Sequence, residues 1–295
     1  MVWQRFLHAQ RVVVVASDIS LTCCWKRGES WCWRQGSLPM DSCRDGLPLQ
    51  QEIVGDFLAD LLLDSGVVGA QIELLLPTGA CQWRVLDGPI PADRSSLSRL
   101  ARRAIADQTT AFSAQDLYVS TPAWGDSTLA IGVSRALLQA WIGVMEVADL
   151  PLQRVEWSLV SALRALRDSI PDWSSGALLW LIQPQETSPF RVLILRDGTP
   201  EVDRTIPAND KAAEVVREII QAWSPRANQP LRWVSSVGDG AHVERWFTTD
   251  NGRSWEHVLP DIPWTVEPWN PGLEPGGLDP LTRLTLAGLQ ESLDR

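Results

Sequence analysis

The residue with the clearest potential for chemistry is Asp18, in a short polar turn that follows the aliphatic run Val12–Val15. A carboxylate in this position could hold Mg²⁺ through water, although a site for Mg²⁺ and phosphate normally has more than one anchoring group. Aspartate is also common in turns after a strand, for conformational reasons alone. The residues themselves leave both interpretations of Asp18 open.

Cysteine, histidine and the common catalytic motifs offer little further chemistry. The five cysteines are an odd number in a chain without an export signal, which favours reduced thiols. Cys23 and Cys24 are adjacent and should point to opposite faces of a strand, and no C-x-x-C pair occurs, so the spacing argues against structural zinc. The three histidines lie far apart, and no P-loop, G-x-G-x-x-G or H-E-x-x-H motif occurs. Direct catalysis is not expected.

One further motif, TTDNGRSW at residues 248–255, matches the Asp-box of sialidase propellers. Propellers carry one copy per blade, whereas this chain has a single copy. We therefore interpret the motif as a hairpin turn with Trp255 packed on it, and reject a glycan-processing enzyme.

Composition and charge limit the kind of partner. The 295-residue chain is 45% hydrophobic and 21% charged, as in ordinary globular proteins, and is long enough for two lobes. Its net charge of −10 argues against binding nucleic acid or an anionic membrane through a broad basic surface. No apolar run approaches the roughly 18 residues of a membrane span. These features predict a cytoplasmic protein that reaches a membrane only through a partner, without inserting into it.

Two similar elements should position the polar turns. Residues 11–28 and 176–198 each contain a buried strand, a tight polar turn and a second strand that ends at a glycine, which predicts two hairpins. Between them, residues 81–152 show the order strand, helix, strand, strand, helix, which predicts a small α+β module. We place the first lobe at 1–80 and 153–175, the inserted module at 81–152 and the second lobe at 176–295.

Apolar residues at helical spacing predict the helices. The first covers residues 50–65, with Ile53 among its core-facing residues. Ser134 and Asp279 precede two others as expected N-caps. The remaining helices are expected at 93–107, 156–168 and 209–223, and the last helix at 279–293.

Two longer stretches carry a more specific signal. In the first, a strand that ends in Leu-Pro (residues 70–77) leads into the insertion, which closes with ADLPLQRVEWSLVSALRAL at residues 148–166. The second is FRVLILRDGTPEVDRTIP at residues 190–207. In this order the chain resembles the PilM family of type IV pilus assembly proteins and, less closely, the cytoplasmic domain of the type II secretion protein GspL. The resemblance extends from the first hairpin to the last helix.

The resemblance implies an α/β, actin-like ATPase (ribonuclease H-like) fold of two lobes, with a small α+β subdomain inserted in the first lobe and a reduced second lobe. It implies a scaffold that binds the cytoplasmic N-terminal peptide of a PilN-like inner-membrane protein and contacts pilus motor ATPases. In the family this peptide lies between the first lobe and the inserted subdomain. Here the groove should be lined by Trp83, Val85, Tyr118 and Val119, with Trp83 and Tyr118 as aromatic anchors. Trp83 could instead fill the core of the subdomain.

The resemblance also implies a nucleotide site. Asp18, Ser20 and Thr22 would form the first phosphate turn, with Asp18 holding Mg²⁺, and Gly238 and Gly240 would belong to the adenosine-side turn.

The chain departs from the family at this site. Ser20 replaces a glycine of the first turn, which leaves less room for a phosphate. In the second turn Gln183 occupies the expected position of a carboxylate, and Pro184 lacks a backbone N–H. We therefore expect a degenerate site and a non-enzymatic scaffold for which ATP with Mg²⁺ is not required. The alternative hypothesis is an active ATPase whose nucleotide state switches pilus, competence or type II secretion assembly.

Overall fold

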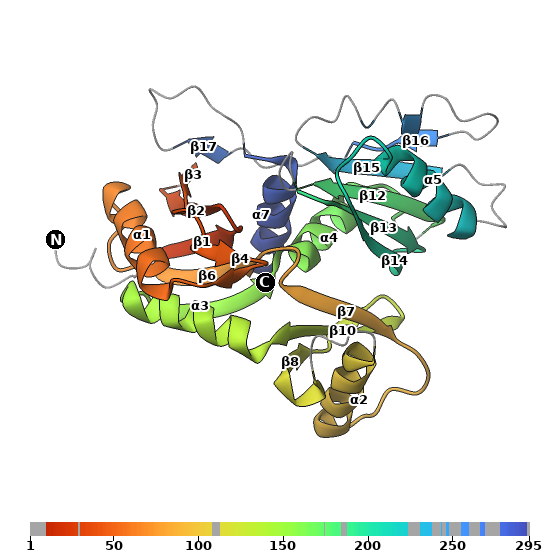
Figure 1. The fold of residues 1–295 in the computed structure, drawn as a ribbon, viewed down its shortest axis with the longest axis horizontal. Coiled ribbons are helices and arrows are strands. Elements are labelled where there is room, and N and C mark those ends of the chain that lie inside the picture. The colour runs from red at the N-terminus through yellow and green to blue at the C-terminus, as the bar shows by residue number, and fades with distance from the viewer. Residues whose placement is uncertain are drawn as a thin grey trace. The chain divides into compact units, whose positions relative to one another are not determined.

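The structure is a computed structural model of the 295-residue chain. It describes residues 10–28, 30–107, 113–173, 175–183, 188–223, 231–237, 243, 246–247, 255–259, 266–268 and 278–293. The chain divides into two compact units, residues 1–160 with 264–276 and residues 161–263 with 277–295. Figure 1 labels their helices and strands.

The first unit is built on a six-stranded sheet with the order β11-β6-β1-β2-β3-β17 (Figure 1). Strands β1, β2 and β3 form an antiparallel meander, whereas β6 and β11 run parallel to β1 on its other side. The hairpin predicted for residues 11–28 is confirmed. The strands are β1 (Arg11–Ala16), β2 (Ser20–Arg27), β3 (Ser30–Ser37), β6 (Gln71–Leu76), β11 (Leu152–Trp157) and β17 (Val266–Pro268).

Two helices, α1 (Gln51–Asp64) and α3 (Arg135–Val147), pack against each other on this unit. The buried stripe of α1 includes Val54, Leu58 and Leu61. The prediction that Ile53 faces the core is wrong: Ile53 is 43% exposed, because it lies one residue, about 100° of helical rotation, away from Val54. The loop before α1 contains the short hairpin of β4 (Cys43–Arg44) and β5 (Leu47–Pro48).

The inserted module has its own sheet, of order β7-β10-β8, with β9 also paired to β10. Helix α2 covers one face of this sheet. The elements are β7 (Cys81–Leu86), α2 (Arg94–Ala106), a 3-10 turn (Ala114–Asp116), β8 (Leu117–Ser120), β9 (Ala123–Trp124) and β10 (Ser127–Ser134). Ser134 does not cap α3 through its side chain as predicted; it is still paired with Leu117 in the β10–β8 ladder.

The chain returns from this module through α3 to β11, which pairs in parallel with β6. β11 differs from the sequence prediction, which began a helix at Glu156. Glu156 and Trp157 are instead the last residues of β11, and α4 (Ser158–Ser169) follows directly. The parallel partner β6 is far away in sequence, so local periodicity could not reveal this strand.

The second unit contains a five-stranded sheet of order β14-β13-β12-β15-β16. The predicted second hairpin is confirmed as β12 and β13. Helix α5 and the sheet share a core that includes Leu181, Ile194 and Val216. The elements are β12 (Ala177–Gln183), β13 (Phe190–Arg196), β14 (Thr199–Ile206), α5 (Ala212–Trp223), β15 (Leu231–Val237), β16 (Trp255–His257) and α7 (Pro280–Leu293).

The two sheets repeat one design. The order β3-β2-β1-β6-β11 corresponds to β14-β13-β12-β15-β16: a three-stranded antiparallel meander, followed on the other side of its first strand by two parallel strands. In each unit the first hairpin therefore occupies the same place in the sheet.

Candidate functional site

The first polar turn joins β1 to β2, and its carboxylate is held by the backbone of another loop. Oδ1 of Asp18 accepts the backbone N–H of Gly46 at 2.6 Å, and Oδ2 accepts that of Asp45 at 3.1 Å. Within the turn, Ser17 Oγ accepts the backbone N–H of Ser20 at 2.9 Å. Asp18 itself is exposed, so these bonds form at the surface of the unit.

The two predicted hydroxyl partners of Asp18 also have protein neighbours. Ser20 Oγ lies 2.9 Å from Ser17 Oγ and accepts from Gln35 Nε2 at 3.2 Å. Thr22 is only 3% exposed, within β2. The turn therefore brings Asp18 and Ser20 together, whereas Thr22 is buried in the strand.

The pKa of the Cys43 thiol reflects the electrostatics beside this turn. Burial raises the pKa of Cys43 to about 11, and the nearby carboxylate of Asp18 adds to the rise. A thiol in this state stays protonated and is a poor metal ligand.

The described residues of the first turn offer a Mg²⁺ ion a single carboxylate, that of Asp18. Mg²⁺ requires near-octahedral oxygen coordination, commonly from one or two carboxylates with phosphate and water. In the described part of the chain no three His, Cys, Asp or Glu side chains gather in a way that could hold a metal ion. Both oxygens of Asp18 already accept backbone N–H groups, so the carboxylate has a structural role in the geometry observed.

In the second unit, Gln183 ends β12 at the position where the resemblance implied a carboxylate. It is 5% exposed, and its Nε2 donates to the carbonyl O of Ser188 at 3.0 Å. The side chain thus helps to close the hairpin. The rest of the predicted turn (184–187), Gly238 and Gly240, and most of the Asp-box motif lie outside the described residues.

The four residues predicted to bind a partner lie on β7 and β8 of the inserted module. Directly paired residues of antiparallel strands point to the same face. Trp83 pairs with Ile131 and Tyr118 with Val133, and Ile131 and Val133 share one face of β10, so Trp83, Val85 and Tyr118 lie on one face of the small sheet.

Val119 lies on the opposite face. It packs against the core beneath α2 that contains Leu117 and Ile105. We call the face that carries Trp83, Val85, Tyr118, Ile131 and Val133 the open face, since α2 covers the other one. Two further residues of this face, Cys81 and Leu129, are buried.

The open face has one buried and one exposed aromatic ring. Trp83 is 8% exposed and meets Trp157 edge-on, with ring centroids 5.5 Å apart. Tyr118 is 37% exposed, and the Arg135 guanidinium lies 4.4 Å from its ring centroid. Among the described strands, β7 and β8 each pair within this sheet on one side only, with β10.

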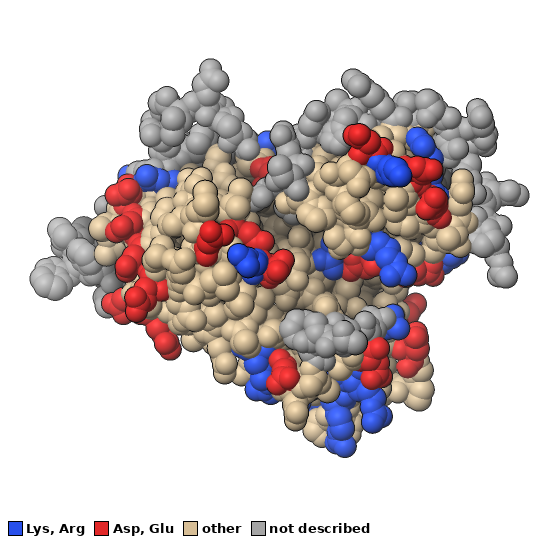
Figure 2. All heavy atoms as spheres, in the orientation of Figure 1, with Lys and Arg blue, Asp and Glu red and all other residues tan. Residues whose placement is uncertain are grey.

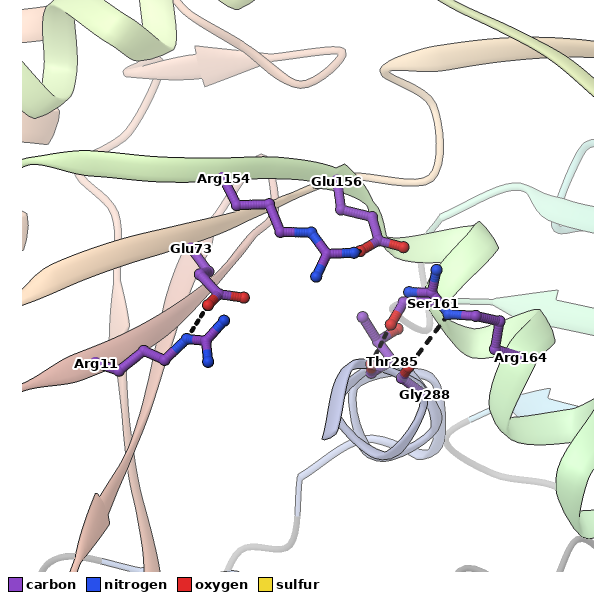
Figure 3. A network of polar contacts seen from close by, with 8 residues as sticks. All are labelled: Arg11, Glu73, Arg154, Glu156, Ser161, Arg164, Thr285 and Gly288. Atoms are coloured by element: carbon purple, nitrogen blue, oxygen red, sulfur yellow. Dashed lines mark hydrogen bonds and ion pairs between the residues drawn. The ribbon is translucent and has the colours of Figure 1, made fainter. Parts of the chain in front are cut away.

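Sequence reasoning missed two ion pairs in the first unit, in each of which the carboxylate is more buried than the guanidinium. Figure 3 shows Arg11 directed at Glu73 and Arg154 beside Glu156. Glu73 is 2% exposed and pairs with Arg11, while its Oε2 has no hydrogen-bond partner among the described residues. A glutamate within the apolar strand QIELLL was the available sequence signal.

Within the second unit, α4 and α7 pack closely. Ser161 Oγ donates to the carbonyl O of Thr285 at 2.7 Å, and Arg164 Nε donates to that of Gly288 at 3.2 Å (Figure 3). At the start of α7, Asp279 Oδ1 accepts the backbone N–H of Thr282 at 2.9 Å.

The surface charge is mixed. Acidic side chains line α1 in Figure 2, where Glu52, Asp56, Asp60 and Asp64 follow at intervals of four residues. The arginines of α2 are interspersed with acidic residues in the same view. The described residues on this face form no broad basic surface.

Two sheets of the same strand order, each opened by an antiparallel hairpin, together with a module inserted in the first unit, define the class: the chain has the actin-like ATPase fold. By sequence, it matches no protein-family model and no curated protein.

Within this fold class the chain is similar to the solved "PilM-PilN type IV pilus biogenesis complex". The match has a TM-score of 0.71 at 12% identity and covers 95% of this chain and 98% of that one. It is also similar to the cytoplasmic domain of EpsL, an inner-membrane component of the type II secretion system of Vibrio cholerae, with a TM-score of 0.50, 14% identity, and coverage of 97% and 95%. A Bacteroides thetaiotaomicron protein described as having an actin-like ATPase fold and unknown function matches with a TM-score of 0.56 at 5% identity, over 97% and 99% of the two chains. The fold expected from the sequence is confirmed.

No helix among the described residues is long and apolar enough to cross a membrane.

Proposed function

We propose that this chain is a docking scaffold of a type IV pilus or related assembly system, and that it holds the cytoplasmic N-terminal tail of a PilN-like membrane protein. The observation that carries the proposal is the similarity, over nearly the whole length of both chains, to the protein of a PilM–PilN complex. The open face of the inserted module, with the exposed ring of Tyr118 on the outer strand β8, supports it. Such a partner would hold the chain at the inner face of the membrane.

An extended tail can add to the edge of β8 through backbone hydrogen bonds, with its apolar side chains directed at the open face. Tyr118 is the accessible aromatic anchor in this arrangement, and Arg135 above its ring limits the rotamers that it can adopt. Trp83 is a supporting residue, because most of its surface is already buried. Val119 is not part of the proposed face, since it packs beneath α2.

The test uses, as a synthetic peptide, the cytoplasmic N-terminal tail of a PilN-like membrane protein from the same organism, with affinity measured by fluorescence anisotropy. Truncating an interface anchor commonly costs ~2 kcal/mol or more, so Tyr118→Ala should weaken binding by roughly 30-fold. Leu63→Ala is the matched control, because Leu63 is 66% exposed on α1, away from the open face. Trp83→Ala, with its fold checked by circular dichroism, tests the supporting ring. Wild-type affinity in Tyr118→Ala would place the docking site elsewhere.

The competing function is an ATPase switch. The engaged carboxylate of Asp18 and the amide of Gln183 argue against it. Titration of the purified protein with ATP and Mg²⁺ decides between the two: saturable binding with turnover would refute a scaffold that works without nucleotide.

A further inference from the structure

Asp18 belongs to a chain of contacts that leads from the first turn to the inserted module. The two N–H groups that it accepts come from consecutive residues with positive φ, Asp45 at 52° and Gly46 at 76°. This is the geometry of a type I′ hairpin turn, formed here between β4 and β5. Because both N–H groups converge on one carboxylate, Asp18 fixes the orientation of this turn.

The other side of Gly46 faces the two connections of the inserted module. Its carbonyl O accepts Trp141 Nε1 at 2.8 Å, and Trp141 is completely buried on α3. A Cβ on Gly46 would lie 3.1 Å from Ala80 Cβ and 3.3 Å from Pro77 Cγ. Gly46 therefore lies against residues 77–80, which lead into β7. It is also hydrogen-bonded to α3, the helix that leads back out of the module.

The segment at Pro77 is held from a second direction. Trp157 Nε1 donates to the carbonyl O atoms of Pro77 and Thr78, each at 3.1 Å, and the Trp157 ring meets Trp83 of the open face. Hydrogen bonds and close approaches thus lead from Asp18 through Gly46 and Pro77 to Trp157 and Trp83.

We infer that Asp18 is a metal-independent clamp, whose carboxylate positions the β4–β5 turn and, through Gly46, both connections of the inserted module. In this chain the turn that resembles a phosphate turn has become a support for the module. The clamp follows from the contacts alone; its importance for docking rests on the proposed function of the open face.

The two bonds also decide how a cation would act. A Mg²⁺ ion bound directly by the carboxylate would draw charge from the oxygens that accept the N–H groups of Asp45 and Gly46, and would so weaken these hydrogen bonds. A clamp without metal therefore predicts that added Mg²⁺ leaves this turn unchanged, whereas Mg²⁺ coordination by Asp18 predicts faster hydrogen exchange in it.

The experiment is amide hydrogen exchange on the full chain, without partner. Asp18→Asn keeps the side-chain shape but turns one acceptor into an NH₂ group that faces a backbone N–H. We expect exchange at least tenfold faster at Asp45 and Gly46, and faster exchange also in residues 77–86. Asp197→Asn is the matched control in the other unit, because Asp197 Oδ1 likewise accepts a backbone N–H, that of Gly176, at 2.9 Å. It should leave both segments unchanged.

Two further measurements keep the inference falsifiable. Trp141→Phe removes only the Nε1 donor to Gly46 and should accelerate exchange in residues 77–86 as well, which tests the same path if Asp18→Asn fails to fold. Addition of 5 mM MgCl₂ or Mg–ATP to the wild type should leave exchange at Asp45 and Gly46 unaltered. The inference is overturned if neither Asp18→Asn nor Trp141→Phe accelerates hydrogen exchange in residues 77–86. It is also overturned if Mg²⁺ changes exchange at Asp45 and Gly46 in the wild type but not in Asp18→Asn. Because these experiments use no partner, their outcome does not depend on whether the proposed docking partner is correct.

Discussion

Replacing Gly55 by alanine should destabilise the first unit, although alanine is the better helix former. Gly55 lies in α1 at its contact with α3. A Cβ at this position would lie 2.7 Å from Cβ and Cγ1 of Val147 and 2.8 Å from the carbonyl O of Val144. These distances are far inside van der Waals contact, and Val144 O belongs to the backbone of α3. The added methyl group can be accommodated only if the two helices move apart.

The expected size follows from two opposing terms. Glycine to alanine in a helix interior gains about 1 kcal/mol. Overpacking a core costs roughly 1–3 kcal/mol, and we take the upper half of that range because a branched side chain and a backbone carbonyl both stand in the way. The net loss in the free energy of unfolding is therefore about 1–2 kcal/mol.

Gly143 provides the matched control in the same helix pair. A Cβ on Gly143 of α3 would meet only the amide end of Gln51, an exposed side chain that can rotate into solvent. Gly143→Ala should keep most of the helix-propensity gain, so its stability should equal or exceed that of the wild type by up to about 1 kcal/mol.

Differential scanning calorimetry and urea unfolding of the two variants provide the measurement. A unit of this size shifts its Tm by about 2–4 °C per kcal/mol, so Gly55→Ala should lower the Tm by about 2–8 °C, with no decrease for Gly143→Ala. If Gly55→Ala proves as stable as Gly143→Ala, the close approach of α1 to α3 is incorrect.

Three further predictions address other parts of the chain. Gly288→Ala should cost about 3 kcal/mol or more, because its Cβ would overlap the backbone carbonyl of Ser161 in α4; a variant with the wild-type urea midpoint would contradict that packing. Burial raises the pKa of Cys23 from 9.0 to about 12, so this thiol ionises first in the unfolded chain, and the free energy of unfolding should fall as pH rises from 9 towards 12. A thiol reagent at pH 8 should label the chain only after unfolding. Rapid labelling of all five cysteines in the native state would refute their burial. The backbone N–H of Ser96 holds the pKa of Asp93 at about 2, below its ordinary 3.8, so the cap should stabilise α2 at neutral pH and lose its effect as pH falls towards 2; equal hydrogen exchange of α2 in Asp93→Ala and wild type at pH 7 would exclude it.

The parts of the fold that could be predicted from sequence are those determined by neighbouring residues. Val12, Val13 and Val14 of β1 and the aliphatic run of β12 are buried. The second strand of each hairpin is followed by a glycine with positive φ, Gly28 and Gly198. The amphipathic stripe of α5 likewise packs as its spacing predicts. Local pattern and tertiary burial agree in these elements, so either is a sufficient guide.

The rest depends on contacts between residues far apart in the sequence. β11 contains Arg154 and Glu156, and only its parallel pairing with β6 makes it a strand. The role of Asp18 could not be inferred, because its partners Asp45 and Gly46 follow 27 and 28 residues later. The dipeptide Asp45-Gly46 favours a tight turn, but nothing local says which carboxylate it faces.

The connection between β6 and β11 has a consequence for how such a protein can change over evolutionary time. These neighbouring parallel strands need a crossover, and α3 alone is enough to provide it. Residues 77–134 thus occupy the place of a simple loop between β6 and α3. Doubling a flexible loop costs only about 0.6 kcal/mol of closure entropy, so a loop is where a lineage can gain, lose or exchange a module while the sheet persists. The binding specificity can then diverge in this segment. Each new module must keep a hydrogen-bond acceptor for Trp141 and a connection that fits against Gly46, as the segment at Pro77 and Ala80 does.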